Sequence, residues 1–166
     1  MTVAADHTVT SDEVFDVLGP RLALGITADP ASTADNVILY VAHSSPITDH
    51  GVVDTGMITR LSGPDLSTRT DVVTGLPRSY ANHGPNSLHF GPDGKLYLAM
   101  GGSTGAGAAN TAGSEFGERG EQELSAALVV ADIKRPGFDG SCQNVANMYG
   151  PAPCDVEIFA SGLRNT

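Results

Sequence analysis

The stretch 88–103 reads LHFGPDGKLYLAMGGS, and its pattern occurs once before, at 24–44, as LGITADPASTADNVILYVAHS. Each copy is a strand, a turn, and an apolar strand that carries a tyrosine. Each is followed by another hairpin strand and by an outer strand that ends in Gly-Leu. These following strands are GMITRLS and TDVVTGLP in the first unit, and AALVVADIK and VEIFASGLRN in the second. Units of four short strands, repeated in order, predict the blades of a β-propeller, because a sandwich has no reason to repeat the order.

Two strands and one turn carry this fold prediction. Segments 36–42 and 95–100 are apolar on both alternating faces, so each strand should be covered on both sides. In the GPDGK turn, Pro92 fixes φ, Asp93 can bond its own backbone, and Gly94 supplies a positive φ. Helical patterns are short, at 11–18 and 120–128. We therefore predict an all-β fold of four-stranded antiparallel blades, with Tyr40 and Tyr97 at matching positions.

The number of repeats predicts an incomplete propeller. About two blades are visible, whereas a closed propeller needs at least about four. We expect residues 1–19 to form a lead-in segment and 20–166 to be the N-terminal part of a larger propeller, whose remaining blades are its partner. The insertions 101–123 and 134–155 should emerge on the face that displays binding groups.

Charge and composition exclude several classes of partner. Lys and Arg number 9 against 19 Asp and Glu, which gives a net charge of −10. Such a chain repels phosphate backbones and anionic lipids, so we expect no nucleic acid partner. No segment approaches the ~18–20 apolar residues of a membrane span, so we expect no membrane insertion. The start, MTVAADHTVTSDE, lacks the basic and apolar regions of a signal peptide.

The two cysteines, Cys142 and Cys154, lie in one stretch rich in Gly, Pro and Asn. Such a pair can form a disulfide in an oxidising compartment, and the alternative is two reduced thiols that never meet. Zinc is not expected, because two thiolates without a nearby His leave half of a four-ligand shell empty. The disulfide prediction favours an extracellular or periplasmic location.

The segment from Asn82-His83 through FGPDGKLYLAMGG, with IFASGLRNT at 158–166, resembles the soluble quinoprotein glucose/sorbosone dehydrogenase family. The resemblance covers roughly 20–166. It implies a six-bladed propeller that uses pyrroloquinoline quinone and calcium to oxidise a sugar or polyol. It also implies roles for three residues: His83 as the catalytic base, Arg164 against the quinone, and Asn165 lining the cofactor site. Calcium is possible, with ligands outside this chain.

One position departs from the family's pattern. The aspartate that orients the histidine there is replaced by Gly102, and Ser103 is a weaker substitute than a carboxylate. The segment GGSTGAGAAN…GEQELSAALVVADI also resembles propeller modules of large bacterial surface proteins. The alternative function is therefore a non-catalytic propeller module that binds carbohydrate or protein.

Other polar groups form weaker patterns. His43 and His50, with Asp49 and Asp54 nearby, match no helical metal motif and are expected in a polar loop. The loop acids Asp132, Asp139 and Asp155 lack the dense spacing of a calcium loop, and the Gly-rich segment lacks the Lys-Ser/Thr end of a phosphate loop. The acidic run of Glu115, Glu118, Glu121 and Glu123 is expected to be a solvated face, and the alternative is that it helps to bind a cation or a partner of the insertion.

Overall fold

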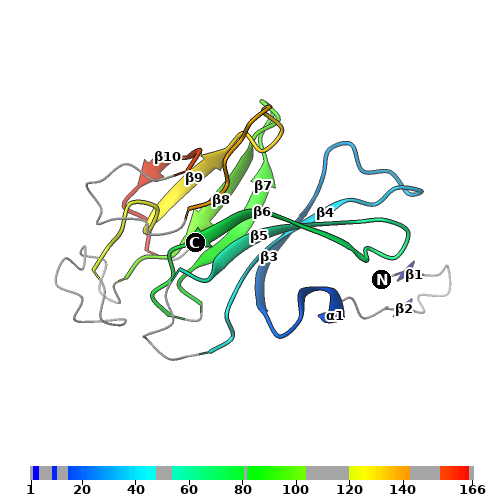
Figure 1. Cartoon of the computed structure of the whole chain (residues 1–166), viewed down its shortest axis with the longest axis horizontal. Helices are drawn as coiled ribbons and strands as arrows, with labels where there is room; N and C mark the ends of the chain where they lie inside the picture. The colour runs from blue at the N-terminus through cyan, green and yellow to red at the C-terminus, as the bar shows by residue number, and fades with distance from the viewer. Residues whose placement is uncertain are drawn as a thin grey trace.

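The computed structural model describes residues 2–3, 9–10, 15–47, 54–80, 82–103, 120–142 and 154–164. Within these ranges, two antiparallel four-stranded sheets carry most of the secondary structure (Figure 1). The first sheet consists of β3 (Leu22–Ala28), β4 (Leu39–Ser44), β5 (Gly56–Ser62) and β6 (Thr68–Leu76). The second consists of β7 (Pro85–Phe90), β8 (Leu96–Met100), β9 (Ala127–Ala131) and β10 (Val156–Ser161). The strand pair β1 (Thr2–Val3) and β2 (Val9–Thr10) and the helix α1 (Phe15–Leu18) lie before them in sequence.

Both sheets are simple meanders, and their first strands, β3 and β7, pack against each other. The two backbones approach closely at Gly25, where an added Cβ would lie 2.2 Å from the Asn86 carbonyl oxygen. Only glycine fits at such a contact. Consecutive strand order with neighbouring inner strands is the arrangement of adjacent propeller blades. The prediction of an all-β, incomplete propeller is therefore confirmed.

The two units match in detail at their second strands, β4 and β8. Tyr40 is the second residue of β4 and Tyr97 the second residue of β8. The Tyr40 hydroxyl donates to Asp29 Oδ2 at 3.2 Å, and the Tyr97 hydroxyl donates to Asp93 Oδ2 at 3.0 Å. Each aspartate lies in the turn between the first and second strands of its sheet. The predicted equivalence of the two tyrosines is confirmed.

The hairpin between β7 and β8 has the predicted turn chemistry. Gly94 has a φ of 78°, its N–H donates to the Gly91 carbonyl, and the Lys95 N–H donates to Asp93 Oδ1 at 3.2 Å. A positive φ is costly for residues with a Cβ, so the glycine is needed at this position.

The main hydrophobic core lies between the two sheets. Tyr40 reaches across it and meets the Phe90 ring edge-on, with centroids 5.3 Å apart. Burying each large aliphatic side chain here contributes about 1.5–3 kcal/mol. Core members from both sheets include Ala42, Ile58, Val73, Leu76, Leu88, Leu96, Leu98, Met100, Val129 and Val156.

The helix expected at 120–128 is absent. Residues 120–126 form turns, and β9 begins at Ala127. Ser125 Oγ accepts the Gln122 N–H at 2.8 Å, and Ala126 has a φ of 51°, so the backbone turns instead of continuing as a helix. Of the helix expected at 11–18, the described part is α1, and positions 11–14 lie outside the described residues.

The expectation that both insertions emerge on one face is wrong. The insertion at 101–123 joins β8 to β9, whereas the insertion at 134–155 joins β9 to β10. In an antiparallel meander, successive connections lie at opposite ends of the sheet. Only the first insertion therefore lies at the end where Met100 leads into Gly101 and Gly102.

The predicted disulfide is present at the second insertion. Cys142 and Cys154 are joined with an S–S distance of 2.08 Å and a Cα–Cα distance of 5.0 Å. This bond is compatible with an oxidising compartment such as the periplasm or the cell exterior. Within the described ranges, no helix is long and apolar enough to span a bilayer.

Candidate functional site

His83 lies in a tight turn that leads into the inner strand β7. The His83 N–H donates to the Tyr80 carbonyl at 3.0 Å, and the Ser79 N–H donates to the His83 carbonyl at 3.1 Å. This turn holds the histidine at the end of the sheet and not within its central core, although its exposed fraction is only 6%.

The backbone of Gly101 and Gly102 runs directly past this turn. The Gly101 N–H donates to the Gly84 carbonyl at 2.9 Å. A Cβ on Gly101 would lie 2.7 Å from His83 Cα, closer than real Cβ atoms approach. The glycine therefore allows the end of β8 to lie against the histidine turn.

The Gly102 carbonyl fixes the tautomer of His83. His83 Nδ1 lies 2.8 Å from the Gly102 carbonyl oxygen, which also accepts a bond from Ser79 Oγ at 3.0 Å. A carbonyl oxygen can only accept, so Nδ1 carries the proton. Nε2 of the neutral ring is then the basic nitrogen, which is the form that a general base needs.

Arg164 meets the same glycine from the other side. The Gly102 N–H donates to the Arg164 carbonyl at 2.6 Å, and the Leu163 N–H donates to the Ala126 carbonyl at 2.9 Å. The Arg164 residue is exposed. The structure thus brings the two predicted residues His83 and Arg164 to one glycine, while Asn165 lies outside the described residues.

Glu121 also belongs to this site, and the sequence analysis missed it. Its exposed fraction is 7%, so the expectation of a solvated acidic residue is wrong at this position. Oε1 accepts the Ser103 N–H at 2.8 Å, and Oε2 accepts the Ser125 hydroxyl at 2.6 Å. Two donors offset the cost of burying the carboxylate. Glu123 is half-buried, and Glu115 and Glu118 lie outside the described residues.

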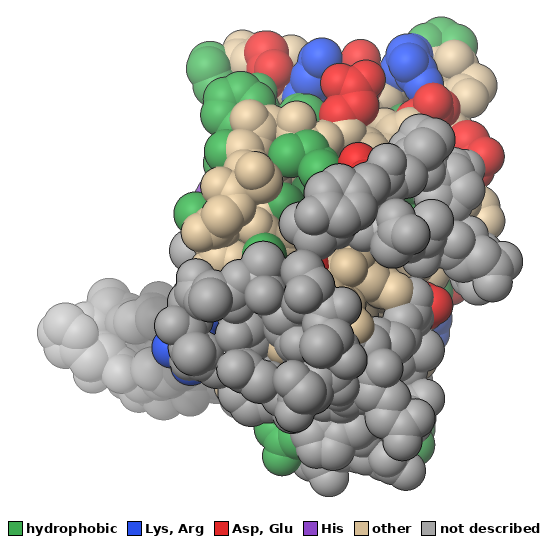
Figure 2. Space-filling model, turned by 90° about the vertical axis from the view of Figure 1, so that its left-hand side faces the viewer, with side chains coloured by type: hydrophobic (Ala, Val, Ile, Leu, Met, Phe, Trp, Pro, Cys, Tyr) green, Lys and Arg blue, Asp and Glu red, His purple; other side chains and the backbone are tan. Residues whose placement is uncertain are grey.

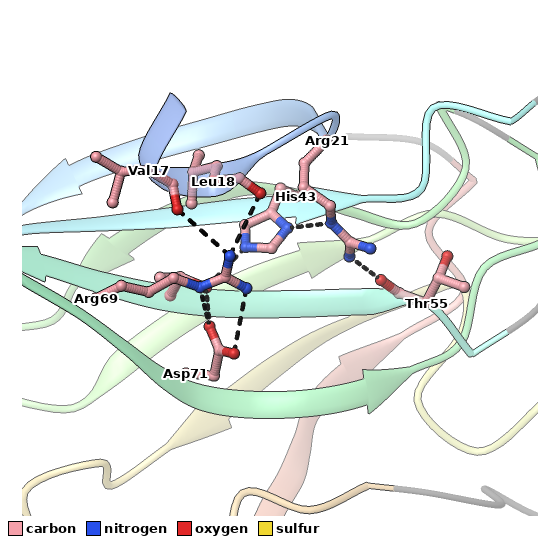
Figure 3. Close-up of polar contacts among 8 residues, drawn as sticks. Val17, Leu18, Arg21, His43, Thr55, Arg69 and Asp71 are labelled. Carbon is pink, nitrogen blue, oxygen red and sulfur yellow. Dashed lines mark hydrogen bonds and ion pairs between the residues drawn. The ribbon is translucent and has the colours of Figure 1, made fainter. Parts of the chain in front are cut away.

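A second buried histidine, His43, lies in β4 and not in the expected polar loop. Arg21 Nε donates to His43 Nδ1 at 2.9 Å (Figure 3). His43 Nε2 lies 2.8 Å from Thr59 Oγ1. Because an arginine can only donate, Nδ1 accepts and Nε2 carries the proton. Thr59 Oγ1 in turn donates to Asp71 Oδ1 at 2.6 Å.

The surroundings of His43 keep its ring neutral. Its exposed fraction is 0%, and this burial, together with the positive charges of Arg21 and Arg69, lowers the pKa of His43 to about 4. Burial alone raises the pKa of Asp71, but hydrogen bonds from Arg69 and Thr59 lower it overall. Arg69 also donates to the carbonyls of Val17 and Leu18, which ties α1 to this cluster (Figure 3).

The contacts of His43 are those of a structural hydrogen-bond cluster. Among the residues that the structure describes, no group of three or more His, Cys, Asp or Glu side chains could hold a metal ion. His50 and Asp49, which were considered with His43, lie outside those ranges. Both nitrogens of His43 already have hydrogen-bond partners, so its role is structural.

Acidic and basic side chains gather at one end of the face shown in Figure 2. At the hairpin end of the second sheet, a small charged hollow is lined by Lys95, Val130, Asp132, Arg135, Asp155 and Glu157. Arg135 and Asp155 form an ion pair there. This end of the sheet is opposite to the end at which β8 runs into Gly101, so the hollow is separate from the His83 site.

Comparison of the chain with models of known protein families and with curated proteins finds no match.

Proposed function

We propose that this chain is part of a quinone-dependent dehydrogenase of sugars or polyols, with His83 as the general base and Arg164 at the quinone. The resemblance described above supports the proposal. The observation that carries it concerns the two backbone groups of Gly102. Its carbonyl accepts from His83 Nδ1, and its N–H donates to the backbone carbonyl of Arg164. A base and a charge stabiliser that serve one hydride transfer must lie close together, and the contacts of His83 Nδ1 and of the Arg164 backbone carbonyl with Gly102 support this.

The residues present suit pyrroloquinoline quinone, whose bound form supplies the hydride acceptor. Arg164 is exposed and its backbone carbonyl contacts Gly102, so its guanidinium could reach an anionic planar cofactor bound there. A fixed positive charge near the acceptor stabilises the negative charge that develops there. Asn165 would line the same cofactor, and calcium would be held by residues outside this chain.

His83 would move the proton. Nε2 accepts the proton of the substrate hydroxyl while the carbon-bound hydride leaves. The imidazolium that results keeps its Nδ1–H on the Gly102 carbonyl, which orients the ring. A positioned general base of this kind contributes about 10²–10⁴-fold to the rate.

The second candidate function is a non-catalytic propeller module that binds carbohydrate or protein. The low exposure of His83, 6%, favours this candidate, because a base must reach its substrate. In such a module the hydrogen bonds around Gly102 would only shape the end of the blade.

Quinone binding and turnover distinguish the two candidates. The protein expressed from its complete reading frame is given pyrroloquinoline quinone and calcium, and dye-linked oxidation of a panel of aldoses and polyols is measured. We expect His83→Ala to lower kcat by at least about 100-fold. The matched control is His89→Ala, an exposed histidine on β7, the strand that follows His83, and it should leave kcat unchanged.

Arg164→Ala tests the cofactor side, and it should weaken quinone binding by about tenfold or more. Full activity in His83→Ala would remove the base assignment. Absence of quinone binding by the wild-type protein would favour the binding module instead.

A further inference from the structure

The buried carboxylate of Glu121 acts on the same peptide group that holds His83. The Gly102 carbonyl and the Ser103 N–H are the two ends of one peptide unit. Glu121 Oε1 accepts the N–H at 2.8 Å, while the carbonyl accepts from His83 Nδ1 at 2.8 Å. Because a trans peptide is planar, with its N–H and C=O pointing in opposite directions, the carboxylate and the imidazole lie at opposite ends of one rigid unit.

This geometry has an electronic consequence as well as a mechanical one. Charge-assisted hydrogen bonds are about twice as strong as neutral ones. A peptide whose N–H binds an anion is polarised, and its carbonyl becomes a stronger acceptor, by about 10–30% per bond. The negative charge of Glu121 thereby strengthens the bond that holds the Nδ1–H of His83.

Glu121 is itself firmly held against the glycine segment. Its second oxygen accepts the Ser125 hydroxyl at 2.6 Å. A Cβ on Gly102 would lie 3.2 Å from Glu121 Oε1 and 3.2 Å from Ala126 Cβ, so the carboxylate packs directly on this residue. Ser103 and Gly120 are the described residues on either side of the segment 104–119. The hydrogen bond between Ser103 and Glu121 therefore joins the two ends of the first insertion at the site.

We propose that Glu121 is the positioning residue of the His83 site and acts through the Gly102–Ser103 peptide. It fixes the Nδ1–H tautomer of His83 and supplies, at a distance of one peptide unit, the negative charge that stabilises the imidazolium. The consequence for catalysis rests on the proposed dehydrogenase function, whereas the effect on the histidine does not.

The test uses ¹⁵N-labelled chain without cofactor and compares Glu121→Gln, Glu121→Ala and wild type by NMR. The glutamine can still accept the Ser103 N–H but carries no charge, so we expect the tautomer to be kept and the Nδ1–H proton resonance of His83 to move upfield. The alanine removes the acceptor, so we expect a mixture of tautomers and Ser103 amide exchange at least about tenfold faster. Glu123→Ala is the matched control and should behave as wild type, because Glu123 makes none of these described contacts.

Two outcomes would overturn the proposal. One is a His83 Nδ1–H resonance in Glu121→Gln that is unchanged from wild type. The other is a Glu121→Ala variant that keeps the wild-type tautomer and Ser103 exchange rate. If the alanine variant does not fold, the glutamine variant decides alone.

Activity separates this inference from the proposed function. In the quinone-loaded protein from the complete reading frame, Glu121→Gln should lower kcat with little change in KM. A wild-type protein without dehydrogenase activity would overturn the proposed function and leave the NMR result to decide the role of Glu121.

Discussion

The second strands of the two sheets share the pattern Leu-Tyr-x-Ala and then differ. His43 follows this pattern in β4, and Met100 follows it in β8. On the neighbouring strands, Thr59 opposite Val41 corresponds to Val129 opposite Leu98. The second sheet therefore has Met and Val where the first has His and Thr, at equivalent buried positions.

The difference follows from what covers each sheet. Met100 and Val129 face the apolar surface of the first sheet and belong to the shared core. His43 and Thr59 lie on the other side of the first sheet, where Arg21 and Asp71 supply the hydrogen bonds that buried polar groups require. The same strand arrangement therefore accepts either apolar or polar buried side chains at these positions, provided that every buried donor and acceptor has a hydrogen-bond partner.

The two buried histidines differ in the same way. His43 accepts at Nδ1 and donates from Nε2, so both nitrogens serve the structure. His83 donates from Nδ1 to a carbonyl, so its basic nitrogen is Nε2. The two histidines therefore hold opposite tautomers, each set by the group at Nδ1.

The largest expected effect concerns the disulfide in the connection between β9 and β10, where the Cys142 N–H also donates to the Thr74 carbonyl of β6 in the first sheet. Replacing Cys142 and Cys154 by alanine should lower the free energy of unfolding by about 3 kcal/mol, because the closed loop no longer restricts the unfolded chain. Chemical denaturation measures the difference. Wild type in a reducing buffer should behave like the variant, and a loss below about 1 kcal/mol would show that the bond contributes little.

Acid should lower the stability of the fold through His43 in the first sheet. The unfolded His43 takes up a proton near pH 6.5, whereas the folded ring stays neutral down to about pH 4. Between these values the unfolded state binds more protons, so stability falls as the pH falls, by roughly 2–3 kcal/mol. Below this range, protonation of Asp29 and Asp71, whose pKa values are lowered in the folded chain, removes further stability.

His43→Met, which places the second sheet's residue in the first sheet, is the control for the acid prediction. Arg21 loses its acceptor, so the variant should be less stable than wild type near neutral pH. Its stability should change less between pH 6.5 and 4, so the gap between the two proteins should narrow in acid. Parallel pH profiles for both proteins would contradict the role given to His43.

The smallest expected effect compares the two matched tyrosines. Tyr40 is buried and its Asp29 partner also binds Lys134 Nζ at 3.0 Å, whereas the Tyr97–Asp93 bond is exposed. Tyr40→Phe should therefore destabilise the fold by about 1 kcal/mol, and Tyr97→Phe should have no measurable effect. Equal losses of stability for Tyr40→Phe and Tyr97→Phe in thermal denaturation would contradict this difference in burial between the two tyrosines.

Much of the fold could be predicted from the repeat, because strand alternation and turn chemistry are local. Segment GMITRLS coincides with β5, and GPDGK forms the predicted turn. The observed strand β4 begins and ends later in the sequence than the strand predicted at 36–42. The prediction used apolar residues only, so it excluded His43 and Ser44, which are polar but buried. Residues Thr33 and Asn36 instead pair within a turn.

The candidate site was only partly predictable, because its partners meet across the chain. His83 and Arg164 stand out by their motifs. Glu121 does not, since its role depends on a bond to Ser103, which lies 18 residues away. The acidic run predicted a solvated face for Glu121, whereas in the observed turn its carboxylate is buried and accepts from Ser103 and Ser125.

The central claim is that the two buried histidines hold opposite tautomers, each set by the group that its Nδ1 contacts. A long-range ¹H–¹⁵N spectrum of the histidine rings at about pH 8 tests this directly, with His43→Met and His83→Ala assigning the signals. We expect the proton of His43 on Nε2 and the proton of His83 on Nδ1. The same tautomer in both rings, or a His83 proton on Nε2, would contradict the account.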